Sequence, residues 1–244
     1  MAFDLDGTLA ESKQRLPDAM GELLALLLGK MPIAIMSGAS FTQFERQFLP
    51  SIPDTKHIDR LYIFPTNAAQ CYTCVGGIWG PVYDRSFNLF EKGRIMQALK
   101  EALEETGFAE DPTPVWGPRI EDRGAQISFS GLGQQAPLDA KKEWDPTGEK
   151  KKMIREALVR RIPDFSVVAS GMSTIDITQK GINKAYGIRR LVEMTEISVA
   201  EILYIGDALE EGGNDSVVKE TGVHTIEVID PQETSTVIED VLKD

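Results

Sequence analysis

The sequence has none of the long hydrophobic runs of a membrane protein and few of the positive charges of a nucleic-acid binder. Its longest apolar run, residues 23–28, ends before Gly29 and Lys30, well short of the ~20 residues that span a bilayer. The 26 lysines and arginines are outnumbered by 38 aspartates and glutamates, and the net charge of −12 disfavours nucleic acid and anionic membranes as partners. Because a polar motif begins within the first residues, we expect no signal peptide and a cytoplasmic protein.

Cysteine and histidine are also scarce, with two of each. Cys71 and Cys74 form a C-x-x-C pair, a spacing found in redox centres and in half of a zinc site. The pair lies in a segment that alternates like a strand, where residues three apart face opposite sides of the sheet. Since there is no second C-x-x-C, we interpret the pair as two inert thiols, with a metal or redox site as the less favoured alternative.

Both ends of the chain show alternating apolar strands and helices, the pattern of a parallel βα sheet. The 244 residues suffice for one large domain or two small ones, and 42% of them are apolar, as is usual in folded proteins. Helical spacing predicts helices from about residue 17, over 41–48 and from about residue 183. The predicted strands are residues 1–4, 32–37, 61–64, 201–206 and 223–228.

The middle of the chain has a different pattern. Two segments of helical spacing are combined with short strands of hairpin-like spacing, and a polar loop is expected at 137–148. We therefore predict an α/β fold in which a parallel-sheet core, residues 1–81 and 180–244, carries an inserted α+β domain at 82–179.

Polar residues follow the ends of the predicted strands, where ligands bind in open α/β sheets. The first cluster, Asp4-Leu-Asp6-Gly-Thr, holds two carboxylates that repel each other unless a cation lies between them. Mg²⁺ fits, because it takes carboxylate oxygens and keeps waters and substrate phosphate in its shell. A carboxylate can also attack phosphorus, so we predict Asp4 as the nucleophile and Asp6 as the acid and base. The alternative is a solvated acidic turn.

Two further clusters suit a phosphoryl group. Ser37 and Gly38 follow the second strand, and a hydroxyl with free backbone N–H groups can bind a phosphoryl oxygen. Lys184, at a helix start, could neutralise the nucleophile and the transferred group, with Lys180 as the rival candidate. Each is weak alone, since Ser-Gly turns are common and most helix lysines are solvated.

The fourth cluster combines an acidic strand end with a glycine-rich loop. Asp207 follows a buried strand, and the loop continues to Asn214 and Asp215. We predict that Asp207 binds the metal directly and that Asn214 and Asp215 complete or orient its shell. The alternative is an acidic Gly-Gly turn without a ligand.

These four motifs, in this order, resemble the haloacid dehalogenase superfamily along the whole chain. The insertion resembles the cap of its sugar-phosphate branch, and within that branch the sequence is most similar to eukaryotic-type phosphomannomutases. The loop from Gly206-Asp207 to Asn214-Asp215 is the best indicator, and residues 64–67, 120–123 and 171–176 add to it.

The resemblance implies a Rossmann-like core, a cap that closes over the substrate, and Mg²⁺ held by the Asp4 and Asp207 carboxylates and the Asp6 carbonyl. It also implies that Arg123 grips a distal phosphate and that Asp176 contacts the sugar. An ion pair with a neighbouring acid is the alternative for Arg123. The implied partners are a phosphorylated sugar, a hexose bisphosphate activator for a mutase, and a second copy of the chain through the cap.

Three departures separate the sequence from the mutases. Gln134 stands where they have a second phosphate-gripping arginine, and glutamine has neither the charge nor the bidentate fork. Ser128, a predicted substrate contact, stands where they have asparagine, and Ser37 stands where animal mutases have glycine. Losing one charge-assisted bond costs ~1.5–3 kcal/mol, which weakens the grip on a bisphosphate, although Arg119 or residues 150–152 could compensate.

Three functions follow from this reading. The favoured one is a magnesium-dependent phosphatase that hydrolyses a sugar phosphomonoester through an aspartyl-phosphate. The alternative is a phosphomannomutase that interconverts mannose 1-phosphate and mannose 6-phosphate. A non-catalytic phosphosugar-binding protein is least favoured, because Asp4, Asp6 and Asp207 are all present.

Overall fold

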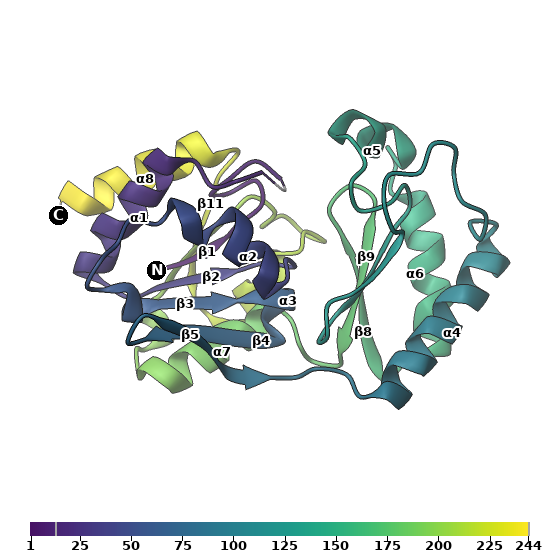
Figure 1. The fold of residues 1–244 in the computed structure, drawn as a ribbon, viewed down its shortest axis with the longest axis horizontal. Helices are drawn as coiled ribbons and strands as arrows, with labels where there is room; N and C mark the ends of the chain where they lie inside the picture. The colour runs from purple at the N-terminus through teal and green to yellow at the C-terminus, as the bar shows by residue number, and fades with distance from the viewer. Residues whose placement is uncertain (13, 244) are drawn as a thin grey trace. The chain divides into compact units, whose positions relative to one another are not determined.

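The computed structural model describes residues 1–12 and 14–243, and the chain forms two compact units (Figure 1). Unit 1 consists of Met1–Asp84 and Ile182–Asp244, and unit 2 is Arg85–Gly181. Within the described residues, no helix is long and apolar enough to cross a membrane.

Unit 1 is built on a seven-stranded sheet in the order β11-β10-β1-β2-β3-β4-β5. The pairings from β11 to β3 are parallel, as the sequence predicts, whereas β4 and β5 add an antiparallel hairpin. The hairpin turns at Gly76 and Gly77, both with positive φ. This antiparallel edge is absent from the sheet predicted from the sequence. The strands are β1 (Ala2–Asp4), β2 (Ile33–Met36), β3 (Leu61–Phe64), β4 (Gln70–Val75), β5 (Ile78–Asp84), β10 (Leu203–Gly206) and β11 (His224–Glu227).

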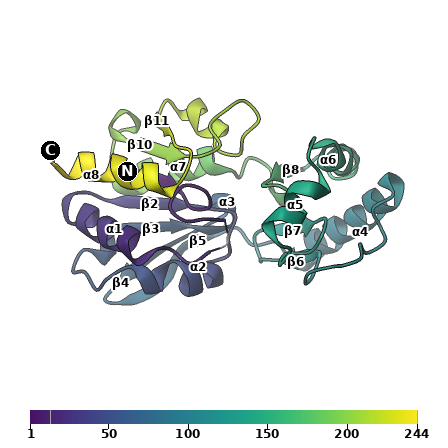
Figure 2. The ribbon, with the colours of Figure 1, turned by 90° about the horizontal axis from the view of Figure 1, so that it is seen from above.

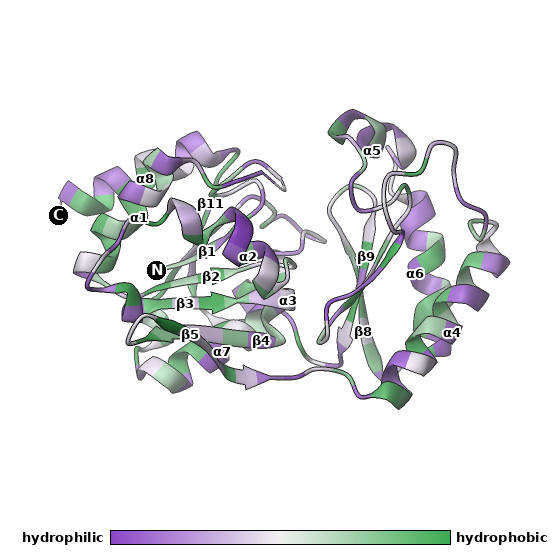
Figure 3. Ribbon diagram, in the orientation of Figure 1, coloured by the Kyte–Doolittle hydropathy of each residue, from purple (hydrophilic) through white to green (hydrophobic). Residues whose placement is uncertain are grey.

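Both faces of this sheet are covered, which explains why its central strands are almost wholly apolar (Figure 3). Phe3 and Ile205 point to the face that packs against α1, α2 and α8, whereas Ala2 and Tyr204 point to the face that packs against α7 and η4. The first group is α1 (Asp18–Lys30), α2 (Phe41–Gln47) and α8 (Pro231–Lys243), and the second is α7 (Lys184–Thr195) and the 3₁₀ segment η4 (Ser216–Thr221) (Figure 2). Short connecting turns are η1 (Leu49–Ser51), η2 (Ile58–Arg60), α3 (Pro65–Ala68) and η3 (Val199–Glu201).

The central strands bring three polar positions to one edge of the sheet. Asp4 ends β1, Ser37 directly follows β2, and Asp207 directly follows β10. Parallel in-register pairing of β1 with both neighbours aligns these ends. The carboxyl edge of the sheet is where this class of fold binds ligands.

Unit 2 is a four-stranded antiparallel sheet in the order β6-β7-β9-β8, with α4 and α6 packed on one face. Alternation along β7 sends Ile127 and Phe129 into the helix-covered core and Ser128 and Ser130 to the opposite face. The elements are α4 (Leu89–Thr106), β6 (Ile120–Asp122), β7 (Ile127–Ser130), α5 (Leu138–Trp144), α6 (Glu149–Arg161), β8 (Phe165–Ser170) and β9 (Thr174–Gln179).

Helix α5 lies where a polar loop was expected. Pro137 occupies its N-cap position, Asp139 lies in its first turn, and Trp144 at its end packs edge-on against Phe108. The helix has no fully buried residue, so its sequence lacks the apolar stripe that would have predicted it.

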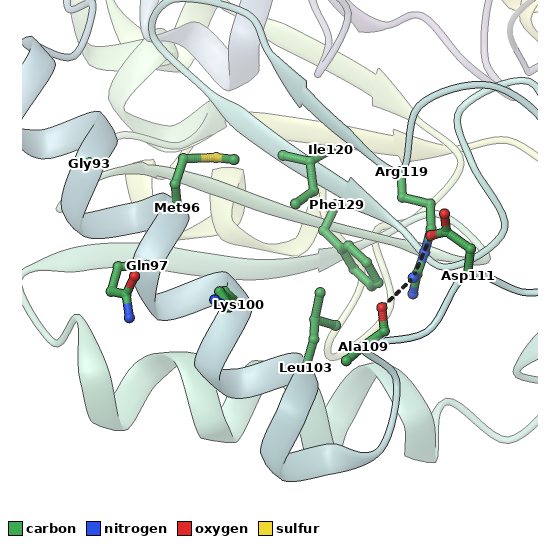
Figure 4. Close-up of a pocket in the computed structure, with 10 residues that line it drawn as sticks. All are labelled: Gly93, Met96, Gln97, Lys100, Leu103, Ala109, Asp111, Arg119, Ile120 and Phe129. Carbon is green, nitrogen blue, oxygen red and sulfur yellow. Dashed lines mark hydrogen bonds and ion pairs between the residues drawn. The ribbon is translucent and has the colours of Figure 1, made fainter.

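A pocket of about 490 Å³ opens between α4 and the helix-covered face of the unit 2 sheet (Figure 4). Met96 and Phe129 contribute apolar surface, and Arg119 lies over the Phe129 ring while binding Asp111. Because Phe129 and Ser128 face opposite sides of β7, this pocket is distinct from the polar face that carries Ser128.

Helix α1 crosses η1 so closely that residue 21 must be glycine. A Cβ on Gly21 would lie 1.8 Å from the Ser51 carbonyl oxygen, whereas the nearest atom to a Cβ on Gly29 lies at 3.9 Å. We expect Gly21→Ala to lower the free energy of unfolding by about 1–3 kcal/mol, because overpacking outweighs the better helix propensity of alanine. Urea denaturation measures the change. Gly29→Ala in the same helix is the matched control and should cost nothing; equal effects of the two changes would contradict the close packing.

Candidate active site

Asp4 is the buried end of β1, and the loop after it is built tightly. The Leu9 N–H donates to the Leu5 carbonyl, and the Gly7 N–H donates to the Ala10 carbonyl. Gly7 has φ +88°, and a Cβ there would lie 2.3 Å from Asp207 Oδ2. The glycine of the first motif is therefore needed both for the turn and for the close approach of the fourth motif.

Lys184 reaches the nucleophile candidate from the first turn of α7. Asn183 caps the helix by accepting the Tyr186 N–H at 2.9 Å. The lysine side chain is only 1% exposed, and its Nζ contacts Asp4 Oδ1 and lies 2.5 Å from Asp215 Oδ1. Lys180, the rival candidate, instead donates to the Pro163 carbonyl in unit 2.

Asp215 is fully buried and accepts three hydrogen bonds. Lys184 Nζ and the Tyr204 hydroxyl both donate to its Oδ1, and the Ala208 N–H donates to its Oδ2 at 3.3 Å. A carboxylate with these donors is stabilised without a metal, so Asp215 is placed to orient Lys184.

The carboxylates of Asp4, Asp207 and Asp215 form one acidic cluster. One oxygen of each carboxylate lies within 4.8 Å of the other two, and Asp207 is the exposed member. Burial raises the pKa of the Asp4 carboxyl well above its usual range; Lys184 lowers it in part and Asp215 raises it again. Partial desolvation and the Asp215 carboxylate also raise the pKa of Asp207. One lysine does not neutralise three close acids, so this all-oxygen donor set fits a divalent cation such as Mg²⁺.

The lysine stays charged in this environment. Burial lowers the pKa of Lys184, but the Asp215 and Asp4 carboxylates more than offset that effect, and the net shift is upward. Burial and the Asp215 charge raise the pKa of Tyr204 well above its usual range, so its hydroxyl remains a donor. The cluster therefore contains one fixed cation and one neutral donor.

The remaining predicted core residues follow β1 and its neighbour β2 or lie in the loop after β10. Ser37 is buried, and its hydroxyl accepts the Ala39 N–H at 3.0 Å, with Gly38 between them. Asp6 is half-buried and contributes to the raised pKa of Asp207. Asn214 is half-buried directly before Asp215.

The predicted residues of unit 2 form their own network. Gln126 Nε2 donates to Ser128 Oγ at 2.8 Å, and Ser128 Oγ donates to Asp176 Oδ1 at 2.7 Å, with all three side chains buried. Arg123 directs Nε and Nη2 at the same oxygen of Glu121, at 2.9 and 2.7 Å. The ion pair that the sequence offered as the alternative for Arg123 is thus present, and its phosphate-binding role stays a prediction.

Sequence reasoning missed two polar residues of these networks, Tyr204 and Gln126. Tyr204 was read only as part of a buried strand, although a buried tyrosine hydroxyl normally needs a partner. Gln126 precedes β7, and its link to Ser128 is not visible from residue types alone. The signal for Tyr204 was its position three residues before Asp207 in an otherwise apolar strand.

Comparison with known proteins agrees with this geometry. The haloacid dehalogenase-like hydrolase family matches residues 140–215. A phosphomannomutase from Encephalitozoon cuniculi is 27% identical over 99% of this chain and 92% of its own length, and one from Spinacia oleracea is 25% identical over 95% and 91%. The structure of a C-terminally truncated IMP-nucleotidase from Plasmodium falciparum has the same fold, with a TM-score of 0.70 at 18% identity, covering 99% of this chain and 70% of that one.

The sequence is haloacid dehalogenase-like over residues 140–215 and phosphomannomutase-like over nearly its full length.

The two aspartates of the fourth motif should respond differently to loss of charge. Asp207→Asn removes the exposed carboxylate, and we expect Mg²⁺ affinity to fall by more than the ~10–100-fold typical of outer-shell changes. For Asp215→Asn the loss of Mg²⁺ affinity should stay within the ~10–100-fold range. The reason is that Asp215 is held by Lys184, Tyr204 and the Ala208 N–H. Isothermal titration calorimetry with MgCl₂ measures both affinities.

Glu210→Gln in the same loop is the control and should leave Mg²⁺ affinity unchanged, because Glu210 is exposed and lies outside the acidic cluster. If Asp215→Asn abolished Mg²⁺ binding as completely as Asp207→Asn, Asp215 would be a direct ligand and the division of roles would be wrong.

Proposed function

We propose that the chain transfers the phosphoryl group of a phosphorylated sugar through Asp4, with Mg²⁺ as cofactor. The observation that carries the proposal is the buried Asp4 carboxylate at the strand end, held through Oδ1 by Lys184 with Asp207 beside it. Lys184 engages one oxygen, which leaves Oδ2 to attack phosphorus. A preorganised nucleophile with a fixed cation is what acyl- and phosphoryl-transfer sites require.

The chemistry then follows from the positions of the side chains. Asp4 Oδ2 forms a bond to phosphorus as the bond to the sugar oxygen breaks, and we propose that Asp6 gives that oxygen its proton. Lys184 offsets negative charge on Asp4 and on the transferred group. A bound Mg²⁺ supplies further positive charge at the phosphoryl oxygens. In the second half, Asp6 takes a proton from the acceptor hydroxyl, which attacks the aspartyl-phosphate and frees Asp4.

The acceptor in that second half decides the reaction. The departures of the sequence from the mutase pattern favour water, and therefore a phosphatase. The full-length similarity to proteins named phosphomannomutase supports a sugar hydroxyl instead, so we propose mutase activity on mannose 1-phosphate and mannose 6-phosphate as the first function. Hydrolysis is the second candidate, supported by the neutral Gln134 where the resemblance expects arginine.

We propose that unit 2 supplies the sugar-binding groups, as a cap. Ser128 and Asp176 are already linked on the sheet face opposite α4 and α6, and Arg123 would exchange Glu121 for a phosphate that it can bind through two N–H groups. A hexose bisphosphate activator belongs to the mutase proposal. The homodimer and the cytoplasmic location stay predictions.

The two reactions are separated by following phosphorus directly. Mannose 1-phosphate is incubated with the protein, MgCl₂ and a hexose bisphosphate, and ³¹P NMR distinguishes the two hexose phosphates from inorganic phosphate. We expect mannose 6-phosphate as the main product, with slow phosphate release. Phosphate alone would establish the phosphatase, and no turnover of any sugar phosphate would refute the proposed function.

Replacing the nucleophile should remove activity without loss of fold. We expect Asp4→Asn to lower kcat by at least about 10³-fold, the scale of nucleophile removal in covalent catalysis. The melting temperature should not fall, because burial already disfavours the charged form of Asp4. Circular dichroism measures the melting temperature. Asp54→Asn, at an exposed position, is the control and should keep full activity; activity in Asp4→Asn would reassign the nucleophile.

A further inference from the structure

Tyr204 is the polar side chain in the short strand β10 (Leu203–Gly206), at the centre of unit 1. It is fully buried on the sheet face that packs against α7, and it pairs in register with Ala2 of β1. Asp4 lies two residues further along β1 and therefore faces the same side. The phenol ring extends along this face until its hydroxyl reaches Asp215 Oδ1.

The hydroxyl completes a continuous chain of contacts to the nucleophile. Tyr204 donates to Asp215 Oδ1, Lys184 Nζ donates to the same oxygen at 2.5 Å, and Lys184 also contacts Asp4 Oδ1. All four side chains are at most 5% exposed, so water does not compete for these bonds. Phenylalanine would fill the same space without reaching Asp215.

We propose that Tyr204 is a positioning residue, whose hydroxyl fixes the Asp215 carboxylate so that Lys184 is directed at Asp4. Two donors on Oδ1 and the Ala208 N–H on Oδ2 define one orientation of the carboxylate. Without the hydroxyl, the Asp215 carboxylate loses one of the three donors that fix its orientation. Lys184 then loses the partner that directs it. The inference rests on the proposed function only in the role it gives to Lys184.

The kinetic consequence is specific. Lys184 offsets charge that develops during phosphoryl transfer, whereas we place sugar recognition in unit 2. Misplacing Lys184 therefore lowers kcat and leaves KM nearly unchanged, because the lost interaction is made in the transition state.

The test is Tyr204→Phe, compared with wild type and with Tyr62→Phe. Tyr62 packs against the same hydrophobic cluster and receives the same change, so it controls for loss of a hydroxyl from this face of the sheet. We expect Tyr204→Phe to lower kcat roughly tenfold, equal to about 1.4 kcal/mol of barrier, with KM and the Mg²⁺ dissociation constant within about twofold of wild type. Tyr62→Phe should change none of them.

A double-mutant cycle identifies the route of the effect. In the Asp215→Asn background, Tyr204→Phe should cause little further loss, because its effect passes through Asp215. Full additivity, unchanged kcat in Tyr204→Phe, or loss of folding in that variant would each overturn the proposal.

Crystal structures of wild type and Tyr204→Phe provide a readout that does not depend on activity. We expect the Asp215 carboxylate to turn and the Lys184–Asp4 contact to be lost in the variant. Identical Asp215 and Lys184 positions would refute the positioning role, whatever the kinetics. Absence of sugar phosphate turnover by wild type would refute the proposed function instead, so the two failures are distinguishable.

Discussion

The structure of unit 1 depends on one electrostatic constraint, which is the accommodation of three close carboxylates around a single buried lysine. Like charges at this separation raise one another's pKa values and destabilise the fold unless cations offset them. Lys184 supplies one cation from the start of α7, and the donors on Asp215 stabilise a second carboxylate. The exposed Asp207 is left where a divalent ion can bind. Lys184 and the other donors thus offset the two buried carboxylates in part, whereas the Asp207 carboxylate is exposed.

The sheet register makes this arrangement possible. Strand β1 has only three residues, yet it pairs on both sides, and a slip of one residue would turn Asp4 to the opposite face, away from Lys184. Gly7 then allows the chain to turn beneath Asp207 without a clash. Packing on both sheet faces thus holds charged groups close together although their mutual repulsion is destabilising, as is common at functional sites.

The sequence predicted the structure best where a chemically reactive residue type stands at the end of an apolar strand pattern. Apolar strands ending in Asp4 or Asp207 predicted both the parallel core and the residues that meet at its edge, because parallel strands place their carboxyl ends together. The sequence predicted less where the hydrogen-bond or packing partner of a residue is decided by tertiary structure. The helix at residues 138–144 has no apolar stripe, and the Tyr204 hydroxyl has a partner eleven residues away across a loop. The hydrogen bond between Ser128 and Asp176 joins two strands that are neighbours in the sheet but far apart in sequence, so the local sequence pattern does not predict it.

The core chemistry does not discriminate between mutase and phosphatase. In the proposed mechanism both reactions need Asp4 to accept the phosphoryl group and Lys184 to offset charge, and they differ in whether a sugar hydroxyl or water accepts the group next. A mutase must hold a second phosphate while the sugar reorients, which requires strong donors outside unit 1. A charge-assisted bond is about twice as strong as a neutral one, so a neutral side chain such as Gln134 would hold phosphate weakly unless Arg123 leaves Glu121. In the proposed function, the balance between the two reactions would depend on whether the Arg123 guanidinium exchanges the Glu121 carboxylate for a phosphate.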